Sequence, residues 1–396
     1  MKFSDFADIN PVVTLNRHEN YSFVELANIE VGNKFVKSKE ERLLKGGGAK
    51  FCTGDTLFAR ITPSLENGKI AQVKDLKRSL GFGSTEFFVF RGKEGVSDND
   101  FIYYLSLSEI LRGPAIKSMS GASGRQRADL QVIKNIEVPD IDYTTQKEIS
   151  FVLSSYDDLI ENNNRRISIL EEMTQKLYRE WFVKFRFPGH EDIKMVDSEL
   201  GEIPMGWEVV SASSAMDINP RTTLAREGDK PYIGMSYLSE DSMVIKGNEY
   251  RSGNSGTKFK NSDTLFARIT PSLENGKTGY VQFLDDENPI GFGSTEFIVL
   301  RSKTLTPEFV YYLARSNSFR DNAIKSMTGA TGRQRVQNSC FDNYFFAQPS
   351  EDILKQFTVI VRSMFELIDF LHRKNVNLRQ QRDLLLPKLI SGKIDV

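Results

Sequence analysis

The sequence predicts a mixed α/β (α+β) protein made of two similar domains, each followed by a long helix. The run DTLFARITPSLENGK at residues 55–69 recurs unchanged at residues 263–277. Short segments rich in β-branched and aromatic residues alternate with a segment of helical apolar spacing. Two other stretches place apolar residues at alternating four- and three-residue steps, which is typical of a coiled-coil seam.

Two further blocks repeat in nearly the same phase. The block GFGSTEF at residues 81–87 recurs at 291–297, and AIKSMSGASGRQR at 115–127 recurs as AIKSMTGATGRQR at 323–335. The spacing of 208 residues between the two copies of the first run is far longer than a solenoid repeat. The repeats therefore indicate two duplicated domains, at residues 1–142 and 188–348.

Each domain is expected to contain short strands and one helix. In the first domain, the strands are predicted at residues 22–27, 56–61, 68–73 and 86–90, and the helix at residues 100–111. The GFGSTEF block has only Gly-x-Gly, without the third glycine of a nucleotide site, so it is interpreted as a tight turn before a strand.

A first long helix is predicted at residues 143–187. Thr145 and Glu148 have capping-box spacing at its start, and Pro188 cannot continue it. If residues 157–183 are continuously helical, this rod is about 40 Å long, roughly one turn of DNA. Its seam residues are Ile160, Asn163, Ile167, Leu170 and Leu177.

A second long helix is predicted at residues 349–396. Ser350 is its candidate N-cap, and it should end or kink at Pro387. Its seam residues are Ile368, Leu371, Asn375, Leu378 and Leu385. Because neither helix buries its seam alone, the two are expected to pack as an antiparallel coiled coil that separates the domains around a pseudo-two-fold axis.

The composition fits a soluble cytoplasmic protein. The 396 residues are 39% hydrophobic and 27% charged, with two cysteines, no signal peptide and no apolar run of membrane-spanning length. The net charge is −1, but cations gather locally. Residues 110–128 hold Arg112, Lys117, Arg125 and Arg127 and no acid, and the second copy differs by one acid, Asp321.

These cationic, Gly- and Ser-rich blocks are candidate DNA contacts, because arginine, lysine and small hydroxyl side chains bind phosphates and base edges. The alternatives are surface loops kept alike for folding and a hairpin turn whose residues geometry requires. In the first domain the candidates are Arg60, Thr62, Ser64, Asn67, Lys69, Ser84, Thr85, Lys117, Ser123, Arg125, Gln126 and Arg127. In the second they are Arg268, Thr270, Ser272, Asn275, Lys277, Ser294, Thr295, Lys325, Thr331, Arg333, Gln334 and Arg335. The unlike segments 31–50 and 239–258 are hypothesised to select bases.

The chain resembles the specificity (S) subunit of type I restriction-modification systems. The resemblance rests on the domain–helix order, on REWFVKFRFPG at residues 179–189, on LGEIPMGW at 200–207 and on LPKLISGK at 386–393. It implies a non-catalytic subunit in which two target recognition domains read a bipartite site in double-stranded DNA. It also implies assembly with two methyltransferase subunits and with restriction subunits, which are expected to carry S-adenosylmethionine, ATP and Mg²⁺; no cofactor or metal is expected on this chain.

Two other functions remain open at this stage. A metal-dependent nuclease would use Asp140 and Glu148, although the Glu-x-Lys of such sites is missing. A coiled-coil adaptor would bind proteins through the long helices without reading DNA. No methyltransferase Asn-Pro-Pro-Tyr or Asp-Pro-Pro-Tyr run and no ATP-binding P-loop is present, and the three histidines do not cluster.

Overall fold

The computed structural model of the chain describes residues 1–394, and the last two residues of the second predicted helical segment lie outside the described residues. The fold is mixed α/β, as predicted, and it divides into two compact units. Unit 1 comprises residues 1–163 and 374–394, and unit 2 comprises residues 164–373. Each unit therefore contains one domain and a segment of both long helices. Within residues 1–394, no helix is long and apolar enough to span a membrane.

The domain of unit 1 has two sheets. The first has the order β1-β9-β6-β7-β3, and the second has the order β4-β2-β8-β5, in which β2 and β8 run parallel. The strands are β1 (Ala7–Ile9), β2 (Asn20–Val24), β3 (Phe35–Val36), β4 (Glu40–Leu43), β5 (Ala49–Cys52), β6 (Thr56–Ala59), β7 (Ile70–Val73), β8 (Leu80–Gly83) and β9 (Phe87–Gly92). The helices are α1 (Phe3–Phe6), α2 (Asn99–Leu107), α3 (Glu109–Lys117) and α4 (Leu130–Lys134).

The domain of unit 2 repeats this plan. Its sheets have the orders β13-β20-β17-β18 and β15-β14-β19-β16, and β14 and β19 are again parallel. The main strands are β13 (Met216–Ile218), β14 (Asp229–Ile233), β15 (Glu249–Ser252), β16 (Thr257–Lys260), β17 (Thr264–Ala267), β18 (Thr278–Tyr280), β19 (Ile290–Gly293) and β20 (Phe297–Ser302). Two additional pairs are β10 (Met195–Ser198) with β11 (Gly201–Pro204) and β12 (Glu208–Ser211) with β21 (Phe345–Gln348). The helices are α6 (Ala212–Ala215), α7 (Pro307–Arg315) and α8 (Asn317–Lys325).

Local structure differs from two of the predictions in the first domain. The helix predicted at residues 100–111 is two helices, because Ser108 is extended and its hydroxyl donates to the Leu105 carbonyl. The GFG part of the repeated block is strand β8, and the turn is formed by the STE part. Gly83 is required there, because a Cβ would lie 2.1 Å from the Val24 carbonyl oxygen of the neighbouring strand.

The two long helices are α5 (Tyr143–Tyr178), which ends in a π-helical turn at Arg179–Val183, and α9 (Glu351–Ile390). The predicted capping box is wrong. Asp142 caps α5 instead, since its carboxylate accepts from the amides of Thr144 and Thr145 at 3.0 and 3.1 Å. Helix α9 does not end at Pro387 but continues for one turn to Ile390. Proline lacks an amide hydrogen, so one backbone hydrogen bond is missing, only one turn before the end of the helix.

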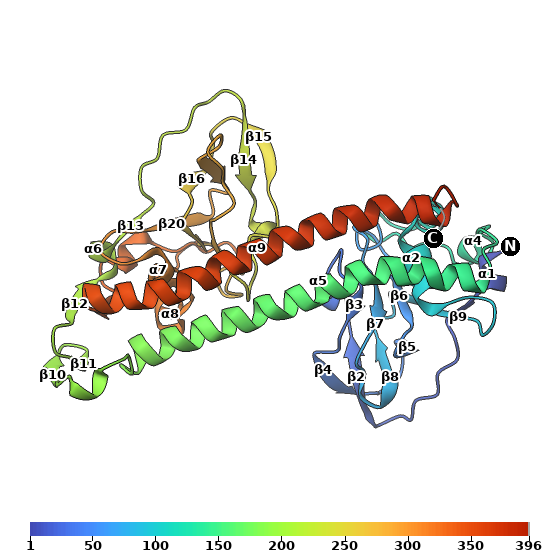
Figure 1. Ribbon diagram of the computed structural model, residues 1–396, viewed down its shortest axis with the longest axis horizontal. Coiled ribbons are helices and arrows are strands. Elements are labelled where there is room, and N and C mark those ends of the chain that lie inside the picture. Colours follow the sequence, from blue (N-terminus) through green and yellow to red (C-terminus); the bar gives the residue numbers. More distant parts are fainter. Residues whose placement is uncertain (395–396) are drawn as a thin grey trace. The chain divides into compact units, whose positions relative to one another are not determined.

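Within each unit the two helix segments run antiparallel (Figure 1). In unit 1, Asp157 contacts Arg382 and Asn163 donates to Asn375 at 2.8 Å. In unit 2, Tyr178 and Phe357 lie 6.4 Å apart, ring to ring. The structure buries the seam residues Ile160, Asn163, Ile167, Ile368, Leu371, Asn375 and Leu378 and half-buries Leu170, Leu177 and Leu385.

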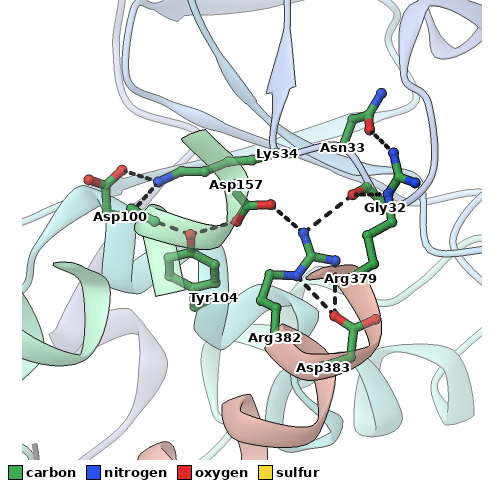
Figure 2. A network of polar contacts seen from close by, with 10 residues as sticks. Gly32, Asn33, Lys34, Asp100, Tyr104, Asp157, Arg379, Arg382 and Asp383 are labelled. Carbon is green, nitrogen blue, oxygen red and sulfur yellow. Dashed lines mark hydrogen bonds and ion pairs between the residues drawn. The ribbon is translucent and has the colours of Figure 1, made fainter. Parts of the chain in front are cut away.

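In unit 1 a buried polar network fastens the domain to both helices (Figure 2). Asp157 accepts from Arg382 and, at 2.6 Å, from the Tyr104 hydroxyl. Arg379 and Arg382 donate to the Gly32 carbonyl at 3.2 and 3.3 Å. Lys34, at 3% exposure, bridges Asp100 and Ser154 at 2.9 and 2.8 Å. The loop at residues 32–34 is thus held by charged side chains of α2 and α9 and by the Ser154 hydroxyl of α5.

Unit 2 is fastened mainly by aromatic packing, together with an ion pair between Arg362 of α9 and the buried Glu308 of α7, at 2.9 Å. Phe182 lies 4.8 Å from both Phe309 and Phe357, ring to ring, and Trp181 lies 5.9 Å from Phe357. The Tyr312 hydroxyl is hydrogen-bonded to that of Thr174 on α5. The end of α5 is therefore part of the core of unit 2.

Candidate nucleic-acid interface

The three repeated blocks of the first domain meet at one corner of unit 1. The amide of Thr62 donates to the Gln126 carbonyl at 2.9 Å, and the amide of Ala128 donates to the Arg60 carbonyl at 2.8 Å. The third block joins through the amide of Arg60, which donates to the Glu86 carbonyl at 3.0 Å. Segments far apart in sequence thus form a single surface, which we call the repeat corner: residues 60–69, 84–86 and 117–128.

Unit 2 builds the same corner from residues 268–277, 294–296 and 325–336. The amides of Thr270, Val336 and Arg268 donate to the carbonyls of Gln334, Arg268 and Glu296 at 3.2, 2.9 and 3.0 Å. The shared residues therefore reproduce the same backbone contacts in both units.

One arginine in each corner is already ion-paired. Arg127 makes a two-pronged contact with Glu86, with Nε at 2.9 Å from Oε2, and Arg335 makes the same contact with Glu296, also at 2.9 Å. The Arg127 guanidinium lowers the pKa of Glu86 below its usual range. These pairs hold the ends of the GRQR segments in place, so Arg127 and Arg335 have a structural partner within the chain.

Several other predicted contact residues also bond inside the domain. Lys69 donates to the Leu26 carbonyl at 2.6 Å, and burial lowers its pKa. Its counterpart Lys277 donates to the Met235 carbonyl at 3.2 Å. The hydroxyls of Thr62 and Thr270 accept from the amides of Gln126 and Gln334, and those of Ser84 and Ser294 accept from the amides of Glu86 and Glu296. In unit 2, Arg268 also donates to the Val336 carbonyl, and Asn275 donates to Glu240. Arg60 lies with its guanidinium carbon 4.7 Å from the centre of the Phe88 ring.

The remaining candidates have no hydrogen bond or ion pair from their side chains within residues 1–394. In unit 1 they are Ser64, Asn67, Thr85, Lys117, Ser123, Arg125 and Gln126, and in unit 2 they are Ser272, Thr295, Lys325, Thr331, Arg333 and Gln334. Most are exposed, and Arg125 and Arg333 occupy equivalent places in the two loops. These side chains are available to an external ligand.

The loop that carries Arg125 is closed at its base. Ser120 and Arg127 exchange backbone hydrogen bonds at 3.1 and 2.9 Å, and the Arg125 amide donates to the Ala122 carbonyl at 2.9 Å. Gly121 has φ of +127°, a conformation that favours glycine, and a Cβ there would approach the Arg125 carbonyl oxygen to 3.3 Å. The loop is thus a fixed turn that presents a cation at its tip.

The chain offers no cluster suited to metal chemistry in the part that the structure describes. No group of three or more His, Cys, Asp or Glu side chains of residues 1–394 could hold a metal ion. Asp140 and Glu148, the residues of the nuclease alternative, are both exposed at the start of α5.

A fourth pair of matching segments escaped the sequence prediction. Residues 8–17 (DINPVVTLNR) and 217–226 (DINPRTTLAR) share seven of ten positions. They are offset by 209 residues, and their identical positions are interrupted at residues 12, 13 and 16, so they form no long unbroken run. Both follow equivalent strands, β1 and β13, and the structure makes the match plain.

Known proteins resemble this chain along its whole length. The model of the family described as "Type I restriction modification DNA specificity domain" matches residues 1–172 and again residues 204–380. The type I restriction enzyme MjaIX specificity subunit of Methanocaldococcus jannaschii is 26% identical over 399 residues, covering 98% of this chain and 87% of that protein. The MjaVIII specificity subunit of the same organism is 23% identical over 335 residues, covering 79% and 78%. In fold, the chain is similar to the type I restriction-modification system S subunit from M. genitalium, with a TM-score of 0.50, 13% identity and coverage of 98% and 95%.

Proposed function

The chain belongs to the type I restriction modification DNA specificity family and is the specificity subunit of such a system, and from this premise we propose that each unit reads one half of a bipartite site in double-stranded DNA. The observation that carries the proposal is the repeat corner. Duplication has kept the same fixed loop with the same exposed arginine, Arg125 or Arg333, in both units. Loops of this kind suit phosphate contacts, which position a protein on DNA without selecting bases.

Base selection is proposed to depend on residues that differ between the units. The unlike segments 31–50 and 239–258 contain β3, β4 and the start of β5 in one unit and β15 with the start of β16 in the other. Strands β4, β5, β15 and β16 belong to the second sheet of their domains, and β3 belongs to the first sheet of unit 1. Exchanging one segment for the other is expected to change one half-site and to leave the other half-site unchanged.

Two methyltransferase subunits are proposed to dock on the long helices. Specificity subunits work in complexes with other subunits and DNA, and exposed apolar side chains on both helices offer contact area. Phe151 on α5 is 76% exposed and Val359 on α9 is 77% exposed, each eight residues after the start of its helix. Docked methyltransferases would supply S-adenosylmethionine, and restriction subunits would supply ATP and Mg²⁺ chemistry. We place the assembly in the cytoplasm, where its DNA substrate is accessible.

The first test is the adenine-methylation map of the source cell with and without this gene, from sequencing that detects modified bases directly. We expect one split motif to disappear on deletion and to return when the gene is restored. An unchanged map in cells that express the methyltransferase partner would contradict the proposal.

A second test isolates the corner arginines. Arg125→Ala and Arg333→Ala should each weaken binding of the assembled complex to all DNA sequences about equally, and should each reduce the slope of log affinity against log salt by about 1. Lys303→Ala is the matched control, because Lys303 is an exposed cation of unit 2 outside the corner. An equal effect of the control, or a changed motif, would show that the arginines do not act as phosphate contacts.

A further inference from the structure

The residues that line a shallow pocket beside the repeat corner of unit 1 have equivalents in unit 2, and some of these differ in chemistry. The pocket has a volume of about 440 Å³. Its walls are residues 10–13, which follow β1, residues 48–50 at the start of β5, and Thr85, Phe87 and Val89 of the turn and strand β9. Thr85 precedes Glu86, so the pocket adjoins the ion pair that anchors the corner.

The backbone around this pocket is the same in both units. Asn10 and Asn219 have φ of +52° and +53°. Each donates its amide to the carbonyl of Val89 or Val299, at 2.7 and 2.8 Å, and accepts from the amide of the same valine through its side chain, at 3.0 and 2.9 Å. The opposite wall also matches, because Gly48 and Gly256 pack against the carbonyls of Gly83 and Gly293 so closely that a Cβ would lie 2.5 and 1.9 Å away. The backbones of Val12 and Arg221, each two positions after the asparagine, therefore have equivalent positions in the two units.

Only three of the ten wall positions differ between the units: Val12 and Arg221, Val13 and Thr222, and Ala49 and Thr257. Two of these pairs are engaged by their own domain. Val13 is buried, and the Thr222 hydroxyl accepts from Arg301 at 3.4 Å. The Thr257 hydroxyl donates to the Ser294 carbonyl at 2.9 Å.

The side chains of the third pair, Val12 and Arg221, are both exposed and can contact an external partner. Val12 is 94% exposed, whereas its neighbour Val13 packs with Leu15 and Phe82. Arg221 is exposed as well, and its guanidinium has no hydrogen-bond or ion-pair partner in residues 1–394. The two units thus share the backbone around this position but differ in its side chain, which is an aliphatic valine in unit 1 and a cationic arginine in unit 2.

We propose that position 12 and its equivalent 221 are specificity-determining residues that read one base pair in each half-site, Arg221 a guanine and Val12 a thymine. This inference rests on the proposed function. In the major groove the guanidinium fork matches guanine O6 and N7, and an aliphatic side chain contacts the thymine methyl group. The two half-sites therefore differ at the base pair that these residues contact.

The test uses the chain assembled with its methyltransferase partner and a library of sites randomised in both halves, with adenine methylation read by sequencing. Arg221→Val should lower the preference for guanine at one position of one half-site about ten- to a hundredfold, and should leave the other half-site unchanged. Arg221→Lys keeps the charge but loses the planar fork, so it should weaken the guanine preference less than Arg221→Val does, while methylation overall persists. Val12→Arg should introduce a guanine preference in the other half-site, and Val96→Arg, an added cation away from the pocket, should not.

The outcomes distinguish a failure of the proposed function from a failure of the assignment of Arg221 and Val12 as base-reading residues. A wild-type complex that methylates no split motif would overturn the proposed function and this inference with it. A wild-type motif that all Arg221 variants retain would overturn only the inference. A loss of methylation at every sequence in Arg221→Val, with Arg221→Lys close to the wild type, would make Arg221 a phosphate contact, which also overturns it.

Discussion

The two units share the repeat corner but differ in how they hold the long helices. Equivalent tyrosines, Tyr104 and Tyr312, both bond to α5, yet Tyr104 meets the Asp157 carboxylate and Tyr312 meets the Thr174 hydroxyl. In unit 1 Arg382 bonds to that carboxylate and to the Gly32 carbonyl. In unit 2 aromatic rings pack around Phe357 of α9, and the ion pair of this helix lies between Arg362 and Glu308 of α7, at 2.9 Å. Surfaces that contact a repeated external ligand can stay alike, because the ligand presents the same groups twice. Internal attachments are free to differ, because each meets a different helix segment.

The largest loss of stability is expected at the buried ion pair between Asp157 and Arg382 of unit 1. Asp157→Leu should destabilise unit 1 by about 3–5 kcal/mol, because it leaves the Arg382 charge buried without its main partner. Adding Arg382→Met should recover most of that loss, since an apolar pair replaces both charges. Both tryptophans, Trp181 and Trp207, lie in unit 2. The loss should therefore appear in hydrogen exchange of residues 20–90, with little change in the tryptophan-fluorescence transition. A double variant no more stable than Asp157→Leu would mean that the pair is not the source of the loss.

The aromatic attachment of unit 2 should be more tolerant. Phe357→Leu keeps most of the buried apolar volume, so it should cost about 1–1.5 kcal/mol. The change should shift the tryptophan-fluorescence transition, because Phe357 lies 5.9 Å from Trp181, ring to ring. Phe370→Leu on the same helix is the matched control, since Phe370 is 56% exposed and should leave the transition in place. A loss as large as that of Asp157→Leu would show that ring geometry, and not buried volume, holds this unit.

Sequence patterns predicted the parts of this fold that repeat or have a period. The duplicated blocks identified both domains, and the spacing of Asn163 and Asn375 marked positions that the structure pairs. The convergence of residues 60–69, 84–86 and 117–128 depends on strand order, which no local pattern encodes. The helical pattern includes position 157, but the partners of its carboxylate, Tyr104 and Arg382, lie 53 and 225 residues away. Likewise, nothing in the repeat shows that Arg127 is paired and Arg125 is free, because this depends on the side chain of Glu86.

The smallest effect concerns Glu171, the α5 carboxylate of unit 2 that corresponds in role to Asp157. It accepts from the Ser242 hydroxyl and the Met243 amide, both at 2.7 Å, and burial raises its pKa. A carboxyl whose pKa is raised on folding stabilises the folded state below its unfolded pKa of about 4.3, and this contribution is lost as the pH rises through the folded pKa. Glu171→Gln keeps an acceptor oxygen and stays neutral, so the stability of unit 2 should fall less between pH 4 and pH 7 in this variant than in the wild type, measured from the tryptophan-fluorescence transition.

The neighbouring residue gives a control of opposite sign. Glu172 is exposed and bonds to Lys176, which lowers its pKa, so its contribution is present above pH 4.3 and is lost as the pH falls. Glu172→Gln should therefore weaken unit 2 slightly at pH 7 and leave it unchanged at low pH. If Glu171→Gln instead behaves like Glu172→Gln, the Glu171 carboxylate is ionised in the folded unit without penalty. Unit 2 would then hold α5 by a buried charge, as unit 1 does. The two units would differ only in the groups that bond to this charge.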